Sequence, residues 1–214
     1  MQYFLNSEGS VIIRTVIIAI KENKDFLTRV DGEIGDGDHG INMNKGFTMA
    51  GEQINESHNF SDAANILSQV LMMEIGGSMG PLYGTFFKKF FRETKDHEKI
   101  TGEVFLNMLE SALKGVKEMG QAEVGDKTMI DTLSPAVTGF RDALEMNLSF
   151  EDSLNKCTQA GEKGRDSTKE MIARIGRSAR LGERSRGVLD AGAVSCCIIL
   201  ESMNRSVISI LKTD

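Results

Sequence analysis

The sequence contains no tryptophan, two prolines and three cysteines among its 214 residues. So little proline leaves few obligatory helix breaks, and three cysteines do not make a disulfide framework. Cys157 stands alone, whereas Cys196 and Cys197 are adjacent in an apolar stretch, so we expect buried core thiols. The sequence has no Cys-x-x-Cys spacing, so no metal site is indicated at these cysteines.

The sequence also lacks a run of about 18 or more apolar residues, the length needed to span a membrane as a helix. Its richest apolar segment, residues 11–20, is short and includes Arg14 and Thr15. The first nine residues show no basic region followed by a hydrophobic stretch and a cleavage site. We therefore expect no membrane-spanning helix and a cytoplasmic location.

The sequence has no excess of positive charge: 31 acidic side chains outnumber 25 basic ones, for a formal net charge of −6. Sequence-independent nucleic-acid binding needs clustered Lys and Arg, so we expect no nucleic-acid partner. One segment departs from this balance: residues 161–187 carry eight basic and four acidic side chains, a local charge of about +4. Such a segment is either a solvated helix face or a phosphate site.

The spacing of apolar residues is mostly three and four, which is typical of helices. We predict eight of them, at residues 10–29, 41–57, 61–75, 81–93, 101–119, 129–147, 150–174 and 191–211. The first is rich in β-branched residues, so a strand is also compatible with it. Short links favour antiparallel neighbours, and we predict one all-α domain over residues 1–214, an up-and-down bundle or barrel.

Glycine is concentrated in alternate links of this predicted array, at residues 32–40, 76–84, 120–125 and 176–192. Alternate links of an antiparallel array share one end, so these four are expected to meet. Glycine allows close backbone approach, and helix N-termini present N–H groups to anions. The pattern predicts a phosphate site at that end.

The densest cluster of acidic residues is Asp31, Asp36 and Asp38, next to His39 and Asn42. Glycines 35, 37 and 40 fit a dinucleotide fingerprint in spacing, but the aspartates would repel pyrophosphate and no strand precedes them. An EF-hand is excluded, because residues 41 and 47 are Ile and Phe where that loop needs Gly and an acidic ligand.

Two interpretations of this cluster remain open. The three carboxylates are hard oxygen ligands suited to Mg²⁺ that also binds phosphate. Alternatively, the segment is an acidic surface turn whose aspartates cap helices. His39 and Asn42 could contact phosphate or ribose, or could be ordinary hydrogen-bonded groups.

Gly80 is not followed by Lys-Ser/Thr, so no P-loop is present. Asp126, Lys127 and Thr128 could cap a helix or bind, and Asp190 could cap the last one.

Four segments, taken together, resemble the nucleotide-binding L subunit of bacterial dihydroxyacetone kinases. They are EIGDGDHGINMN at 33–44, GGSMGPLYGTFF at 76–87, GDKTMID at 125–131 and GRSARLGERS at 176–185. The resemblance covers almost the whole chain. It implies a closed barrel of eight antiparallel helices that holds ADP or ATP at one end through two Mg²⁺ ions.

The resemblance also implies roles for single residues. Asp31, Asp36 and Asp38 match the family's metal ligands. The positions that match its nucleotide contacts are His39, Gly40, Ile41, Asn42, Met79, Gly80, Gly120, Met129, Arg177, Asp190, Ala191 and Gly192. The sugar of this family sits on a separate K subunit, and some members take phosphate from a phosphotransferase-system protein while others use ATP. The implied reaction is phosphoryl transfer to a short ketose, with Arg177 adding positive charge near the phosphates.

Four positions depart from the family pattern. Met79 replaces a small hydroxyl residue, Arg180 an aromatic, Val188 a histidine and Ala191 a proline. A ketose other than dihydroxyacetone, such as a tetrulose, therefore stays open, as does the phosphoryl donor. A nucleotide-loaded regulator without transferase activity and a metal-binding scaffold without nucleotide are the alternatives.

Overall fold

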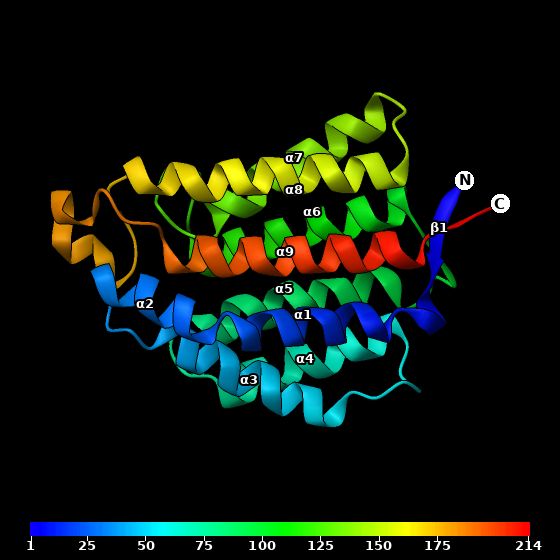
Figure 1. The fold of residues 1–214 in the computed structure, drawn as a ribbon, viewed down its shortest axis with the longest axis horizontal. Coiled ribbons are helices and arrows are strands. Elements are labelled where there is room, and N and C mark those ends of the chain that lie inside the picture. Colours follow the sequence, from blue (N-terminus) through cyan, green and yellow to red (C-terminus); the bar gives the residue numbers. More distant parts are fainter.

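The computed structural model describes residues 1–214 and is mainly helical (Figure 1). Its nine α-helices are α1 (Ser10–Glu22), α2 (Lys24–Ile34), α3 (His39–Gln53), α4 (Phe60–Glu74), α5 (Met79–Thr94), α6 (Gly102–Gly120), α7 (Ile130–Glu145), α8 (Phe150–Ser167) and α9 (Ala191–Ile210). The predicted helical class is confirmed, whereas the structure has nine α-helices where eight were predicted, so the eight-helix barrel is not confirmed.

The extra helix comes from a break in the first predicted one. At Asn23 the backbone leaves helical geometry (φ −96°, ψ 8°), and the side-chain amide donates to the Ala19 carbonyl at 2.9 Å. This local bond competes with the helical ladder. The helix resumes at Lys24, because Leu27 N–H still donates to the Asn23 carbonyl. No strand forms here, since Ile12, Ile13 and Val16 are buried on α1.

A small sheet, absent from the all-α prediction, joins the chain ends. β1 (Gln2–Leu5) pairs antiparallel with β2 (Lys99–Thr101) on one side and β3 (Lys212–Thr213) on the other. Both termini lie at this end of the molecule, and α2 lies at the other (Figure 1). The strands have two to four residues, too few for a periodic pattern to reveal.

The predicted helix at 150–174 ends early, at Ser167. A short 3-10 helix, η2 (Thr168–Glu170), and a second, η3 (Arg177–Ser185), follow before α9. Thr168 is fully buried, its hydroxyl donates to the Arg165 carbonyl at 2.6 Å, and the same oxygen accepts from Asp190 N–H at 3.1 Å. This hydroxyl therefore joins the end of α8 to the start of α9.

One connected cluster of 46 buried residues runs through the helices. On α6 the apolar side chains of Phe105, Leu109 and Val116 are buried, and the Thr101 hydroxyl caps the helix by accepting from Val104 N–H. Each large apolar side chain removed from water contributes roughly 1.5–3 kcal/mol. The stripes thus hold consecutive helices together, and α1 also packs on α9.

The last helix, α9, is both long and apolar. By length and composition alone α9 could cross a membrane, and 67% of its apolar window is buried inside the protein. The polar residues Ser195, Ser202 and Asn204 interrupt its sequence, so α9 contains no continuous apolar run of spanning length. These three are themselves buried and hydrogen-bonded to neighbouring groups. Its burial is that of a core helix.

Candidate functional site

A cavity of about 720 Å³ opens at the end of the array opposite the sheet, where α2 and the 168–190 segment lie (Figure 1). All four glycine-rich links contribute to its wall, so they meet as the alternation of an antiparallel array predicts. α3, α5, α7 and α9 all begin at this cavity. Its volume lies within the range of small-molecule sites, about 300–1,000 Å³.

The aspartates form one cluster on the cavity wall. Asp31 comes from the last turn of α2, and Asp36 and Asp38 from the link that follows. One carboxylate oxygen from each lies within 4.8 Å of the others. Gly37 has φ +73°, and a Cβ at Gly35 would collide with the Asp31 carboxylate. The glycines are what allows three acidic side chains to converge in so short a segment.

The donor set fits magnesium. Three carboxylates offer hard oxygens on one side and leave the cavity side free for phosphate oxygens and water, which Mg²⁺ usually retains. Arg177 at the start of η3 pairs with Asp36, and its Nη1 lies 3.7 Å from Asp38 Oδ2. The cluster therefore already attracts a cationic group, from an element far away in sequence. Both partners are about half exposed, so this pair by itself contributes little to stability.

His39 links α3 to α9 beside the aspartates. Its N–H donates to Asp31 Oδ2 at 3.2 Å, and its Nε2 lies 2.8 Å from Ser195 Oγ. Ser195 in turn lies 2.6 Å from the Tyr83 hydroxyl. Burial lowers the pKa of His39 to about 4, although the Asp31 carboxylate opposes this. The imidazole is therefore neutral at pH 7 and positions α3, and it adds no positive charge to the cavity.

Asp190 caps α9 at the cavity wall, with Oδ2 accepting from Ala193 N–H at 2.8 Å. Burial raises the pKa of this carboxyl to about 7. The Ala193 N–H and the Lys127 ammonium work against that rise, whereas Asp131 and Asp31 add to it. The sequence predicted the cap but not the altered pKa, which depends on groups from three other elements.

Most of the predicted site residues line the cavity. Besides the groups above, these are Asn42, Met79, Gly120, Met129, Ala191 and Gly192. Gly40, Ile41 and Gly80 do not. Gly40 packs closely on the α2 backbone and Gly80 on the end of α4, while Ile41 is 52% exposed. The nucleotide contacts predicted for these three and for the residues that line the cavity all stay a prediction.

Sequence reasoning missed part of the wall. Leu82, Val116 and Ile130 line an apolar portion, but at the ends of amphipathic helices they look like ordinary core residues. Lys127 is 1% exposed although it lies in a polar link. From the sequence, Lys127 was predicted only to cap a helix or to bind a ligand. Its burial depends on the 168–190 segment folding over it.

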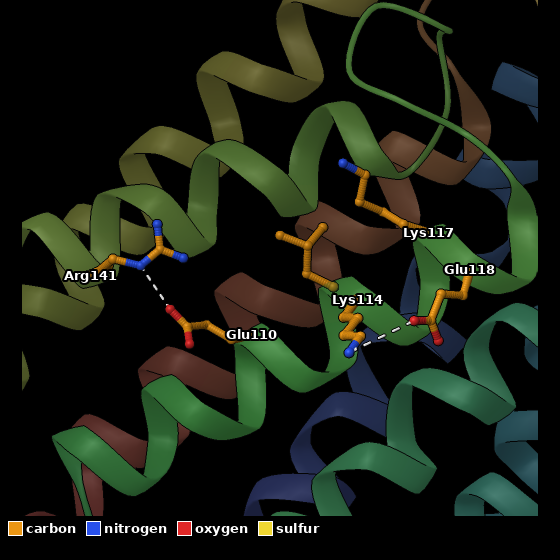
Figure 2. A pocket seen from close by; sticks show the side chains of 6 residues that line it. Glu110, Lys114, Lys117, Glu118 and Arg141 are labelled. Carbon is orange, nitrogen blue, oxygen red and sulfur yellow. Dashed lines mark hydrogen bonds and ion pairs between the residues drawn. The ribbon is translucent and has the colours of Figure 1, made fainter.

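A second depression, of about 410 Å³, lies on the outer face of α6 (Figure 2). Arg141 from α7 points toward Glu110, with Nε 2.7 Å from Oε1, and Lys114 pairs with Glu118 on α6. All four side chains are more than a third exposed. These paired charges form a solvated helix face with no buried polar group facing the depression.

The sequence matches a known family over most of its length. Residues 33–205 match the DAK2 domain family. The chain is 38% identical over 182 residues to the ADP-binding subunit DhaL of the PEP-dependent dihydroxyacetone kinase of Escherichia coli K12, covering 84% of this chain and 86% of the relative. It is 34% identical over 189 residues to the DhaL subunit of the PTS-dependent kinase of Lactococcus lactis, covering 86% and 88%.

Longer proteins are similar over one part. The L-erythrulose kinase of Pectobacterium atrosepticum is 29% identical over 205 residues, which are 94% of this chain and 34% of that kinase. The dihydroxyacetone kinase of C. freundii in complex with AMP-PNP and Mg²⁺ superposes with a TM-score of 0.70 at 21% identity, covering 92% of this chain and 33% of that one. The chain thus spans about a third of each.

The geometry defines the class of this protein: it is helical, with an acidic cavity at one end. The chain belongs to the DAK2 domain family, with most of its length similar to DhaL subunits of dihydroxyacetone kinases. The resemblance predicted from four sequence segments is confirmed. At the level of the family, the relatives are kinases.

Proposed function

We propose that this chain is the nucleotide-binding subunit of a dihydroxyacetone-type kinase, which holds ADP or ATP with two Mg²⁺ ions in the 720 Å³ cavity. The observation that carries the proposal is the convergence of four helix N-termini and three aspartates on one cavity. Helix N-termini favour phosphate and carboxylates favour Mg²⁺, so together they suit a magnesium nucleotide.

Asp31, Asp36 and Asp38 would hold the metal ions. Mg²⁺ held there would supply positive charge that offsets the negative charge of the phosphates during transfer. Arg177 adds a second cation beside Asp36 and Asp38. The apolar wall around Leu82 and Met129 offers a surface for the base. His39 to Asn42, Met79 with Gly80, Gly120, and Asp190 to Gly192 are the remaining proposed nucleotide contacts.

The acceptor is proposed to be dihydroxyacetone or a related short ketose, such as a tetrulose, held on a separate K subunit. Two facts support this range: the close relatives are subunits of dihydroxyacetone kinases, and a longer relative is an L-erythrulose kinase. His39 is held in the contact between α3 and α9, so we assign it no role as a general base. Activation of the sugar hydroxyl is proposed to belong to the partner, as the family resemblance implies. The phosphoryl donor is proposed to be either a phosphotransferase-system protein or ATP.

We also propose a structural frame for this activity. If α1 and α2 count as one member kinked at Asn23, the chain has eight members. Consecutive members pack on each other and α1 packs on α9, which supports a closed ring. The single cluster of 46 buried residues supports one domain over residues 1–214. A cytoplasmic location, without nucleic-acid or membrane partners, belongs to the same proposal.

The test is reconstitution. The purified chain is mixed with a K subunit, Mg²⁺, dihydroxyacetone or a tetrulose, and either ATP or phosphoenolpyruvate with the phosphotransferase proteins. Phosphoketose formation that needs this chain supports the proposal, and the productive ketose and donor are identified in the same assay. Nucleotide binding without transfer under any of these conditions would favour the regulator instead.

A further inference from the structure

The segment 171–188 carries Arg177 to the aspartates but has almost no apolar anchor of its own. Only Ala173 and Ser185 are buried within it. Gly176, Gly182 and Gly187 all have positive φ, so its backbone is folded by turns and by the kinked 3-10 helix η3, with no α-helix or strand. A segment with few apolar contacts opens locally at low free-energy cost unless polar bonds hold it.

Lys127 supplies such bonds from the α6–α7 link. Its Nζ donates to the carbonyls of Ser185 and Val188, both at 2.6 Å, and of Met171 at 3.2 Å. An ammonium has three N–H donors, and all three are used. Lys127 is therefore not free to contact a phosphate, although it lies at the cavity. Its acceptors lie before η3 (Met171), at the last residue of η3 (Ser185) and after it (Val188), so they hold both ends of the part that contains Arg177.

The link is built to hold Lys127 in this place. Its backbone is left-handed (φ +63°), which costs a non-glycine residue about 1 kcal/mol. Asp131 fixes the turn, because its two carboxylate oxygens accept from Gly125 N–H at 2.6 Å and Thr128 N–H at 2.7 Å. Arg174 N–H donates to the Asp126 carbonyl at 3.1 Å, which joins the segment to the same turn.

We propose that Lys127 is a positioning residue of the nucleotide site: it holds segment 171–188 closed so that Arg177 lies over Asp36 and Asp38. The inference rests on the proposed function for its effect on nucleotide binding, but not for the anchoring itself. Replacing the ammonium leaves three carbonyls without their hydrogen-bond donor. Each carbonyl left unsatisfied costs free energy in the closed position of the segment. The segment, and not the helix array, is expected to loosen.

The anchoring is tested by amide hydrogen exchange of Lys127→Met, which keeps a side chain of similar length without the ammonium. Amides of Ala173, Arg174 and Gly187 should exchange at least about tenfold faster, while those of α4 to α6 keep the wild-type rate. Lys169→Met is the matched control, since it removes an exposed lysine of the adjoining η2 turn. Unchanged exchange in segment 171–188 of Lys127→Met would overturn the proposal.

The link to Arg177 is tested by a double-mutant cycle on affinity for MgADP. Lys127→Met should weaken binding at least about tenfold in the wild-type background and less than about threefold in Arg177→Gln, because the contact it supports is already lost. Lys127→Arg, which keeps the charge, should recover part of the affinity. Equal losses in both backgrounds would mean that Lys127 acts independently of Arg177, and the proposal would fail.

Two further outcomes are separable. If the wild-type chain binds no MgADP, the proposed function fails, and the exchange experiment alone decides whether Lys127 anchors the segment. If Lys127→Met does not fold, the same measurements on Lys127→Arg decide, with faster exchange and partial loss of affinity as the supporting result. Faster exchange with unchanged affinity would contradict the positioning role.

Discussion

At the scale of single residues, the three aspartates and Arg177 define the chemistry. Carboxylates held within 4.8 Å of one another repel unless a cation lies between or beside them. Arg177 supplies one positive charge beside the cluster, but it is exposed and lies at the start of η3, a short 3-10 helix that is kinked at Gly182. Mg²⁺ would neutralise the cluster more completely, so nucleotide binding should depend on both the metal and the carboxylates.

Removing one carboxylate tests this directly. Asp36→Ala and Asp38→Ala should each weaken Mg²⁺-dependent ADP binding at least about tenfold, because each removes a hard oxygen ligand. The helical circular-dichroism signal should persist, since both side chains are partly exposed. Asp25→Ala, an exposed acidic residue at the start of α2, is the control and should bind as the wild type does. Full binding by both cluster variants would remove the metal assignment.

Asp190 makes a prediction about pH. Its pKa is raised by burial to about 7, above an unfolded value near 4, so the folded protein keeps a proton that the unfolded chain loses. Stability from this group is thus greatest at low pH and declines between about pH 4 and pH 7. Asp190→Asn keeps the helix cap but cannot titrate.

Urea unfolding of the nucleotide-free, chelated protein at pH 5 and pH 8 measures this effect. From pH 5 to pH 8 the free energy of unfolding of the wild type should fall by roughly 1–2 kcal/mol more than that of Asp190→Asn. This is less than the whole pKa change implies, because the carboxyl borders the cavity. Identical pH dependence in the two proteins would show that Asp190 has an ordinary pKa.

At the scale of elements, the links carry the site and the helices position the links. The local pattern was enough to predict the aspartate cluster, since Asp31, Asp36 and Asp38 lie within eight residues. That the links share one end followed from antiparallel alternation. The break at Asn23 was missed, because a side-chain bond to Ala19 decides it and helical periodicity continues across it. Burial of Lys127 depends on contacts up to 61 residues away, which no local pattern contains.

The α6–α7 link offers a prediction at this scale. Asp131 is 2% exposed and accepts from two backbone N–H groups, so in Asp131→Asn one of them would face an amide that cannot accept. The free energy of unfolding should fall by about 1–3 kcal/mol. Asp142→Asn on the exposed face of α7 is the control. A stability loss no greater than that of the control would contradict the role of Asp131 in fixing the turn.

At the scale of the whole molecule, the two ends of the helix array have different tasks. The end with the three-stranded sheet ties residues 2–5 to 99–101 and 212–213. The sheet was missed because its strands are short and depend on the termini meeting. The other end gathers positive-φ glycines, acidic side chains and helix N-termini around the cavity. The proposed binding site is thus confined to one end, whereas the buried cluster runs through the helices, so substitutions of exposed cavity residues should leave the core largely intact.

The most direct measurement is mass spectrometry of any nucleotide that co-purifies with the chain, with and without chelator during extraction. We expect ADP or ATP that stays bound to the protein in buffer containing Mg²⁺ and is released by the chelator. Asp38→Ala prepared in the same way should contain no bound nucleotide. No bound nucleotide, together with weak ATP binding that does not respond to Mg²⁺, would contradict the claim that the three aspartates form a magnesium-nucleotide site.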